Sequence, residues 1–427
     1  MAGTAPGARE ALELEIGRVS DRNRPERTKV VIADVVAGTL RTPLSSLLHS
    51  DGNWDTYDVV VRRDGMPLSL VHVAAATPAD EAERLVLDTL TRLTPPAPPW
   101  EDLHPQNWPA VRVAIPTTFS RVDDLERAVR SVSRLRYPAF DIVVVDNRPV
   151  PDRQDYDRIA GASDRAVSIL HEPRAGISAA RNRAFSSCPH DLIAYTDDDS
   201  MVEPNWLEAL VRPLLVSEAV GCSSGLVLPV DICSPEQALF ERLFEGFNRS
   251  FVPRSYPAMA AGEPLFPYAP GRLGTGANMA FRVRWLHQIG GFDVSLGTGT
   301  PSRGGEDLAA FVRIILHGGS AAIEPAAIVW HDFRPTADQL KRQVYGYGVG
   351  LGAMCLALMI AEPRARRDIV RLFPRAAWMY LRSGNCTVRS AEDGEPAPRA
   401  WRMRHAAGML SGPALYLESR YRSRRVA

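Results

Sequence analysis

The chain has 427 residues, which is too long for one ordinary domain and predicts two or three folded units. Its hydrophobic content of 45% and charged content of 23% are ordinary for a globular protein, and its formal net charge of zero excludes a general electrostatic attraction to nucleic acid. The five cysteines are scattered without a C-x-x-C pair, which argues against a disulfide framework or a zinc site.

The part of the chain before residue 110 divides into three segments. Residues 1–27 are polar and charged, so we expect them to be disordered, and they lack the basic and apolar regions of a signal peptide. Short apolar runs at 29–36, 57–63 and 68–75 predict strands, and residues 78–93 carry apolar residues at helical spacing. We therefore expect a small α+β domain over residues 28–95, followed by a proline-rich linker at 96–109.

From residue 111 the pattern changes to alternating strands and helices. We expect strands at 111–116, 141–147, 167–170 and 192–196, and helices at 123–135 and 177–188, the first of them capped by Ser120. Several of the strands are apolar without alternation, which is typical of parallel strands covered on both faces. This order predicts an α/β fold with a parallel sheet.

Ligands of such sheets bind beyond the carboxyl ends of the strands. Five acidic or polar positions and one proline fall there: Pro116, Thr117, Asp146, Asp197, Asp198 and Asp199. Three adjacent aspartates repel one another, and a divalent cation would explain the cluster, because hard metals take carboxylate oxygens. The alternative is that the aspartates cap the helix that begins near residue 203.

Two further segments carry candidate functional residues. In "HEPRAGISAARN", Gly176 leaves room for a ligand at a helix start, and Arg174 and Arg181 are candidates for hydrogen bonds to phosphate. The alternative is that both are surface arginines of an arginine-rich chain. In "RGGEDLAAFVRIILHGG", glycines precede the pair Glu306 and Asp307, which suggests a loop that closes over a ligand, although acids at a helix start are also favoured by the helix dipole.

His331 ends the predicted strand "AAIVWHD". A lone histidine is more often structural, but one at a strand end in a chain that also carries a carboxylate cluster is a candidate metal ligand.

Together these segments resemble the family 2 glycosyltransferases, which have the GT-A fold. The matching segments are "VAIPTTFSR", "VVVDN", "RAGISAARN", "AYTDDDSMVEPNWL", "GANMAFRVRWLHQIGGFD", "GGEDLAAFVRIILHGG" and "VWH". The resemblance covers roughly residues 110–345 and implies an α/β GT-A domain there. One departure is "VVVDNRPV", since the family often carries serine or glycine shortly after the position of Asn147.

The resemblance implies a role for each candidate residue. The residues implied to bind the nucleotide sugar are Pro116, Thr117, Asp146, Arg174, Gly176, Arg181, Asp197 and Asp198. Asp199 resembles the direct ligand of Mn²⁺ or Mg²⁺, and His331 is expected at the metal or the diphosphate. Asp307 resembles the general base of an inverting transfer, with Glu306 as the alternative base. The implied partners are a nucleotide-sugar donor and a hydroxyl acceptor, with no nucleic acid.

Two other classes of function are open at this stage. A sugar nucleotidyltransferase would share the layered fold and the metal but would not need the distant Glu306–Asp307 pair. A non-catalytic GT-A-like scaffold would keep the fold but would have little reason to keep both acid clusters.

Residues 346–427 are expected to form a helical C-terminal extension. The apolar run 345–361 is at the lower edge of a membrane span, and a buried helix is the preferred interpretation over an inserted one. Beyond it, arginines alternate with apolar and aromatic residues, and residues 399–425 carry seven arginines and one acid. We therefore weigh a peripheral membrane contact against a helical cap over the acceptor site, and we expect the protein in the cytoplasm, the peripheral contact being at the inner face of the membrane.

Overall fold

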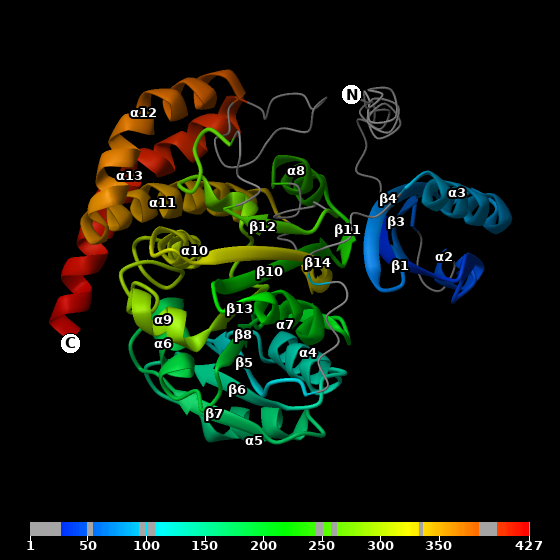
Figure 1. Ribbon diagram of the computed structural model, residues 1–427, viewed down its shortest axis with the longest axis horizontal. Helices are drawn as coiled ribbons and strands as arrows, with labels where there is room; N and C mark the ends of the chain where they lie inside the picture. Colours follow the sequence, from blue (N-terminus) through cyan, green and yellow to red (C-terminus); the bar gives the residue numbers. More distant parts are fainter. Residues whose placement is uncertain are drawn as a thin grey trace.

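The computed structural model describes residues 27–48, 54–93, 100, 107–244, 251–257, 263–332, 336–383 and 399–426. These residues form a small sheet, a larger sheet and a group of C-terminal helices (Figure 1). The segment 1–27 that we expected to be disordered falls outside the described residues except for Arg27, and so does most of the expected linker at 96–109.

The strands and the helix predicted for residues 28–95 are present. The elements are β1 (Thr28–Val36), β2 (Thr39–Leu40), α2 (Leu44–Leu48), β3 (Thr56–Arg63), β4 (Met66–Ala74) and α3 (Ala79–Arg92). β1 pairs parallel with β3, and β3 pairs antiparallel with β4. α3 buries Ala82, Val86 and Leu90, which stand at helical spacing, in the core of this unit.

This small sheet is joined to the rest of the molecule. Strand β1 pairs antiparallel with β11 (Asp231–Ile232), which in the chain directly follows the strand Val220–Pro229 of the larger sheet. A second contact is a cluster of buried apolar residues from both sheets, among them Val30, Val60, Leu228 and Ile328. The N-terminal unit therefore packs against β10 (Val220–Pro229) and β14 (Ser320–His331) of the larger sheet.

The larger sheet has nine strands in the order β12-β14-β10-β13-β8-β5-β6-β7, with β9 on β14. The strands not yet given are β5 (Val111–Thr117), β6 (Phe140–Asp146), β7 (Val167–His171), β8 (Leu192–Tyr195), β9 (Ser200–Val202), β12 (Arg254–Tyr256) and β13 (Met279–Arg282). The strands β8, β5, β6 and β7 are parallel, as predicted, and β13 is antiparallel to both β8 and β10. The predicted parallel sheet is thus one half of a mixed sheet.

Helices cover both faces of this sheet. α4 (Val122–Ser133), α5 (Arg153–Gly161) and α7 (Trp206–Val216) contribute to one apolar core, and α6 (Ile177–Ser186), α9 (Val283–Ile289) and α10 (Glu306–Leu316) contribute to the other. The expectation that Ser120 caps the first helix is wrong. α4 has Arg121 at its N-cap position, and the Ser120 hydroxyl accepts a hydrogen bond from Thr118 within the preceding turn.

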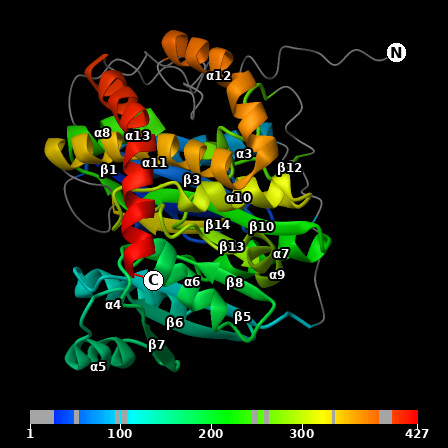
Figure 2. The same cartoon turned by 90° about the vertical axis from the view of Figure 1, so that its left-hand side faces the viewer.

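The C-terminal extension is helical, as predicted. α11 (Ala337–Ala361), α12 (Pro363–Ser383) and α13 (Arg399–Val426) follow the larger sheet, and α8 (Pro235–Phe244) and the short 3-10 helix η4 (Pro270–Arg272) precede them. α13 crosses α11 and ends beside the start of α6 (Figure 2). At the crossing the backbones touch, since a Cβ on Gly348 would lie 2.1 Å from the carbonyl oxygen of His405.

α11 contains the apolar run considered as a membrane span. Among the described residues it is the one helix that is long and apolar enough to cross a bilayer, and 61% of its most apolar window is buried inside the molecule. Leu351, Ala353, Met354 and Leu358 lie in a core shared with α10 and α13. This packing favours the buried-helix interpretation.

Candidate functional site

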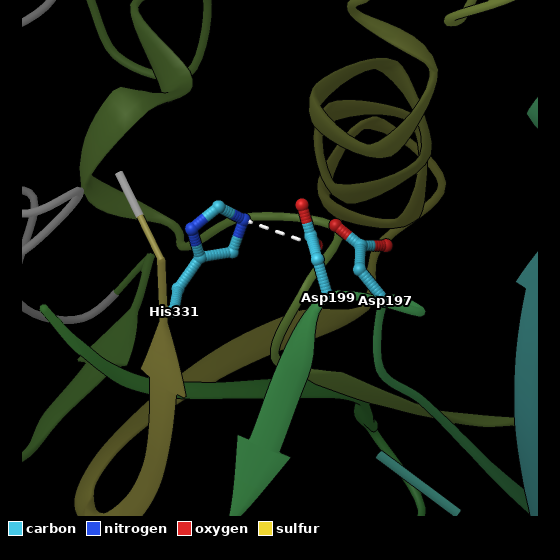
Figure 3. A group of neighbouring side chains, drawn as sticks. All are labelled: Asp197, Asp199 and His331. Carbon is cyan, nitrogen blue, oxygen red and sulfur yellow. Dashed lines mark ion pairs between the residues drawn. The ribbon is translucent and has the colours of Figure 1, made fainter. Parts of the chain in front are cut away.

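The acid cluster after β8 meets a histidine from a distant strand. Asp197, Asp198 and Asp199 form the turn between β8 and β9, and His331 is the last residue of β14. Antiparallel pairing of β9 with β14 sets His331 opposite Ser200, the neighbour of Asp199. One ligand atom from each of Asp197, Asp199 and His331 lies within 4.8 Å of the others, and His331 Nε2 is 3.3 Å from Asp199 Oδ1 (Figure 3).

This group has the chemistry of a divalent-cation site. Carboxylate oxygens suit Mg²⁺ and Mn²⁺, and an imidazole nitrogen is a common further ligand of transition metals. Asp198 is not part of the group, because its Oδ2 accepts a hydrogen bond from Thr117 Oγ1 at 2.6 Å. The alternative that the aspartates cap α7 does not hold, since that helix begins at Trp206 with Asn205 at its N-cap position.

Arg121 lies against the same carboxylates and was not singled out from the sequence. Its Nη2 is 2.7 Å from Asp199 Oδ2 and 3.5 Å from Asp198 Oδ1. Burial raises the pKa of Asp198 to about 6. Burial alone would also raise the pKa of Asp199, but His331 and Arg121 outweigh it and hold that pKa well below its usual value. Asp199 is therefore the carboxylate of this turn whose ionised form is most favoured.

The residues at the ends of β5 and β6 are enclosed. Pro116, Thr117 and Asp146 are buried, and Asp146 accepts hydrogen bonds from the Arg148 guanidinium and from the Tyr156 hydroxyl. Hydrogen bonds from Arg148 lower the pKa of Asp146 despite its burial. Contact of Asp146 with a nucleotide stays a prediction, because Arg148 and Tyr156 occupy its carboxylate.

Arg148 stands where the sequence departs from the resemblance. Its guanidinium lies over the Phe119 ring at 4.2 Å from the ring centre, in addition to its bonds to Asp146. The sequence analysis missed Arg148, which stacks on an aromatic ring at the rim of β5 and β6. Nothing in the sequence distinguishes it from the other arginines of an arginine-rich chain.

The loop before α6 is held by Asn147. Its side chain donates to the carbonyl oxygens of Glu172 and Arg174 at 2.8 and 2.7 Å and accepts from the Gly176 N–H at 2.9 Å. Gly176 has a φ of 119°, and a Cβ there would lie 2.9 Å from Thr300 Cγ2. Glycine is thus required by the backbone at this close approach.

The two candidate arginines of that segment have different surroundings. Arg174 donates to the carbonyl oxygen of Ser423 in α13 at 3.1 Å, so it links the loop to the C-terminal extension. Arg181 is only 1% exposed, which excludes the alternative of a surface arginine. Its contact with phosphate, predicted from the sequence, stays a prediction.

Arg181 joins the two acid clusters. Its Nη1 donates to Glu306 Oε1 at 2.6 Å, and its Nη2 is 3.4 Å from Asp197 Oδ1 and 3.2 Å from the carbonyl oxygen of Gly276. The N–H of Gly276 in turn donates to Asp307 Oδ2 at 2.6 Å. Arg181 therefore connects the group of Asp197, Asp199 and His331 to the start of α10, and the two belong to one site.

Glu306 and Asp307 differ in exposure. Glu306 is 5% exposed, and burial, with the neighbouring charge of Asp307, raises its pKa to about 7 although Arg181 opposes this. Asp307 is partly exposed and accepts hydrogen bonds from the N–H groups of Gly276 and Leu308. Of the two acids, Asp307 is therefore the more exposed.

The glycines before this pair pack on α11. Gly305 precedes α10 with a φ of 86°, and a Cβ there would lie 2.6 Å from the carbonyl oxygen of Gly350. A Cβ on Gly350 would lie 3.0 Å from the carbonyl carbon of Gly304. The first C-terminal helix thus supports the loop that positions Asp307.

Parts of this chain are similar to known proteins. Residues 113–227 match the family described as Glycosyl transferase family 2. The chain is 28% identical over 270 residues to the pre-mycofactocin glycosyltransferase of Mycobacterium tuberculosis, which is 63% of this chain and 51% of the relative. It is 27% identical over 258 residues to the polypeptide N-acetylgalactosaminyltransferase 11 of Xenopus tropicalis, which is 57% of this chain and 40% of the relative. The chain thus spans about half the length, or less, of these curated relatives.

A solved structure is also similar. It is described as the mannosyltransferase PcManGT from Pyrobaculum calidifontis in complex with GDP-Man and Mn²⁺, and it aligns with a TM-score of 0.45 at 17% sequence identity over 73% of this chain and 91% of its own.

The layered α/β sheet and the carboxylate cluster at its rim lie in the part of the chain that includes this match to the glycosyltransferase family model. The chain carries a family 2 glycosyltransferase domain, and the GT-A fold class predicted from its sequence is confirmed.

Proposed function

We propose that this chain is a metal-dependent inverting glycosyltransferase, which moves a sugar from a nucleoside-diphosphate donor to a hydroxyl acceptor. The observation that carries the proposal is the position of Arg181, whose guanidinium bonds to Glu306 and contacts Asp197. A transfer opposite to the leaving group needs a cation on one side of the sugar and a base on the other. Arg181 and Gly276 hold such groups in a fixed relation.

The donor side is formed by β5, β6, α6 and the aspartate turn. Asp197, Asp199 and His331 would hold the cation, and bound there Mn²⁺ or Mg²⁺ would supply positive charge beside the leaving diphosphate. The start of α6, which follows Gly176, is the positive end of a helix dipole and would favour an anion nearby. We infer that Arg121 moves from Asp199 to the diphosphate when both ligands are present.

The acceptor side is formed by α10 and the loop before it. We assign Asp307 as the base that accepts the proton of the attacking hydroxyl, since its carboxylate is partly exposed and oriented by two backbone N–H groups. Glu306 is buried on Arg181, so we assign it to positioning. Attack on the face opposite the leaving group inverts the anomeric centre.

The two other classes have less support. A sugar nucleotidyltransferase has no use for a base that Gly276 and Arg181 tie to the cation cluster. A non-catalytic scaffold would have no need for three close carboxylates. Their burial and mutual repulsion are unfavourable, and both effects raise the pKa of Asp198.

A ligand screen tests the proposal. Nucleotide sugars and free nucleoside diphosphates are added to the intact chain with Mn²⁺, with Mg²⁺ or with a chelator, and the melting temperature is measured. We expect one nucleotide sugar to raise it only with metal, and the same donor to release nucleoside diphosphate on addition of acceptors. Release of pyrophosphate from a nucleoside triphosphate and a sugar phosphate would instead indicate nucleotidyl transfer, and metal-independent binding without turnover would indicate a scaffold.

The same proposal places the enzyme in the cytoplasm, where nucleotide sugars are available as donors. The peripheral membrane contact expected from the sequence is a separate matter that depends on α12.

A further inference from the structure

Helix α12 has a face toward the protein and a face toward solvent. On the inner face Ala365 is fully buried, and Ile369 and Leu372 pack against the core shared with α11 and α13. Asp368 also turns inward, since its Oδ2 accepts a hydrogen bond from the Tyr268 hydroxyl at 2.9 Å. These contacts fix which side of the helix is left outside.

The outer face is apolar. Val370, Phe373, Trp378 and Leu381 are 60%, 67%, 61% and 76% exposed. With Pro374 and Ala377 they stand at positions 370, 373, 374, 377, 378 and 381, which is the i, i+3, i+4 spacing of a continuous stripe along one side of a helix. A helix that only covers a core presents polar residues to water, and a contiguous apolar stripe marks an interaction surface.

Arginines border this stripe. Arg364, Arg366, Arg367, Arg371 and Arg375 are all exposed, and Asp368 is the one acidic residue between Pro363 and Ser383. Arg364, Arg367 and Arg371 line an open hollow of about 350 Å³ together with Asp368. A hollow lined by three guanidinium groups is suited to a phosphate group, to which arginine donates paired hydrogen bonds.

We propose that the outer face of α12 docks this protein on an anionic lipid surface without crossing it. The stripe enters the boundary of the acyl chains, Trp378 lies at the interface, and the bordering arginines bind headgroup phosphates. The bordering positive charges favour an anionic lipid surface over a second copy of the chain. A symmetric pairing of two such stripes would bring the arginines of the two copies close together, and like charges repel. The proposal does not depend on which chemistry the site performs.

Vesicle flotation tests the proposal. The intact chain is mixed with phosphatidylcholine vesicles that either contain or lack phosphatidylglycerol, at low and at high salt. We expect co-flotation with the anionic vesicles, loss of it at high salt because the arginine contacts are screened, and little flotation with the neutral vesicles.

Two double variants separate the apolar and the charged contributions. Phe373→Gln with Trp378→Gln removes the centre of the stripe, and Arg367→Gln with Arg371→Gln removes two bordering charges. We expect each pair to weaken vesicle binding about tenfold or more while the melting temperature stays unchanged, since all four side chains are exposed. The matched control is Leu85→Gln with Arg84→Gln on α3, whose side chains are also exposed, and it should bind vesicles as the wild type does.

Three results would overturn the proposal. One is an intact chain that stays in the soluble fraction at low salt. Another is flotation that neither double variant on α12 reduces. The third is a concentration-dependent dimer in sedimentation velocity that the Phe373→Gln, Trp378→Gln variant dissociates, because a second copy of the chain would then occupy the stripe.

Discussion

Arg181 Nη1 lies 2.6 Å from Glu306 Oε1, although 125 positions separate the two residues in the chain. The pair is buried, and the same guanidinium also contacts Asp197 of the candidate cation cluster at 3.4 Å. Removing one partner of a buried ion pair leaves the other charge uncompensated, so the pair fixes α6 and α10 at a set separation. The distance between the cation cluster and Asp307 is therefore determined by the core of the protein, not by surface loops.

Asp307→Asn is expected to keep donor binding and lose most transfer. The amide cannot accept the proton of the acceptor hydroxyl, while Gly276 still finds an oxygen to which it can donate. General-base catalysis contributes about 10²–10⁴-fold, so kcat should fall by that factor. Steady-state kinetics of donor consumption measure it, with Glu306→Gln as the comparison. A larger loss of kcat in Glu306→Gln, with Asp307→Asn near the wild type, would assign the base to Glu306.

Asp199→Ala is expected to abolish metal-dependent turnover in a protein that stays folded. The change removes the carboxylate that both His331 and Arg121 approach, and with it the candidate ligand that is held ionised. The Mn²⁺-dependent rise in melting temperature should vanish, which a thermal-shift titration measures. Asp332→Ala is the control, because that half-exposed acid follows His331 and pairs with Arg127. Metal dependence in Asp199→Ala equal to that of the wild type would refute the assignment.

Arg121→Ala is expected to increase the affinity for Mn²⁺ in the absence of nucleotide. The guanidinium now compensates the charge of Asp199 and lies 2.7 Å from its Oδ2, so it competes with a cation. Couplings between neighbouring sites are about 1–3 kcal/mol, which corresponds to an increase of about 5- to 150-fold. Titration followed by electron paramagnetic resonance of free Mn²⁺ measures this. Arg127→Ala on the same helix should change nothing, and a weaker Mn²⁺ affinity in Arg121→Ala would contradict the competition.

Glu306→Gln is expected to remove part of the pH dependence of stability. Burial raises the pKa of Glu306 to about 7 in the folded protein, above its value in the unfolded chain. Between those two values the folded state holds more protons than the unfolded state, so the free energy of unfolding falls as the pH rises from about 4.5 to about 7. The contribution is on the order of 3 kcal/mol.

Urea unfolding of metal-free protein at several pH values tests this expectation. The pKa of Asp198, about 6, lies in the same pH window and affects both proteins. The relevant quantity is therefore the difference in the free energy of unfolding between the wild type and Glu306→Gln. The free energy of unfolding of the wild type minus that of the variant should fall steadily from about pH 4.5 to about pH 7 and then stay constant. Parallel curves would mean that Glu306, beside Arg181 and Asp307, is ionised throughout.

Much of this site follows from local patterns in the sequence. Apolar runs that end in acidic residues predict parallel strands with a ligand at their carboxyl ends, and the aspartate turn after β8 lies there. Gly176 and Gly305 stand at positive φ beside close contacts, which are positions that a glycine marks in a sequence.

The remaining features depend on tertiary contacts that no local pattern carries. Whether Arg121, Arg148 or Arg181 faces solvent or a carboxylate depends on packing between elements far apart in the chain. Insertion of β13 antiparallel between β8 and β10 likewise depends on pairing between segments that are far apart in the chain. In an arginine-rich chain, composition hides the few arginines that build the site.

Gly350→Ala is expected to lower kcat, whereas Gly346→Ala four residues earlier on α11 is expected to be tolerated. A Cβ on Gly350 would lie 3.0 Å from the carbonyl carbon of Gly304, and the loop that must give way leads directly to Glu306 and Asp307. A Cβ on Gly346 would meet Arg303 at 3.9 Å, an ordinary contact, and alanine favours a helix by about 1 kcal/mol over glycine. Both variants replace glycine with alanine on the same helix, so the comparison isolates the contact with the loop.

Because a misplacement of about 1 Å at a catalytic group costs about 10²-fold, Gly350→Ala should reduce kcat by about tenfold or more with a small change in KM for the donor. Kinetics of the two variants at matched folded fraction measure this, and equal kcat values would show that α11 does not position the base.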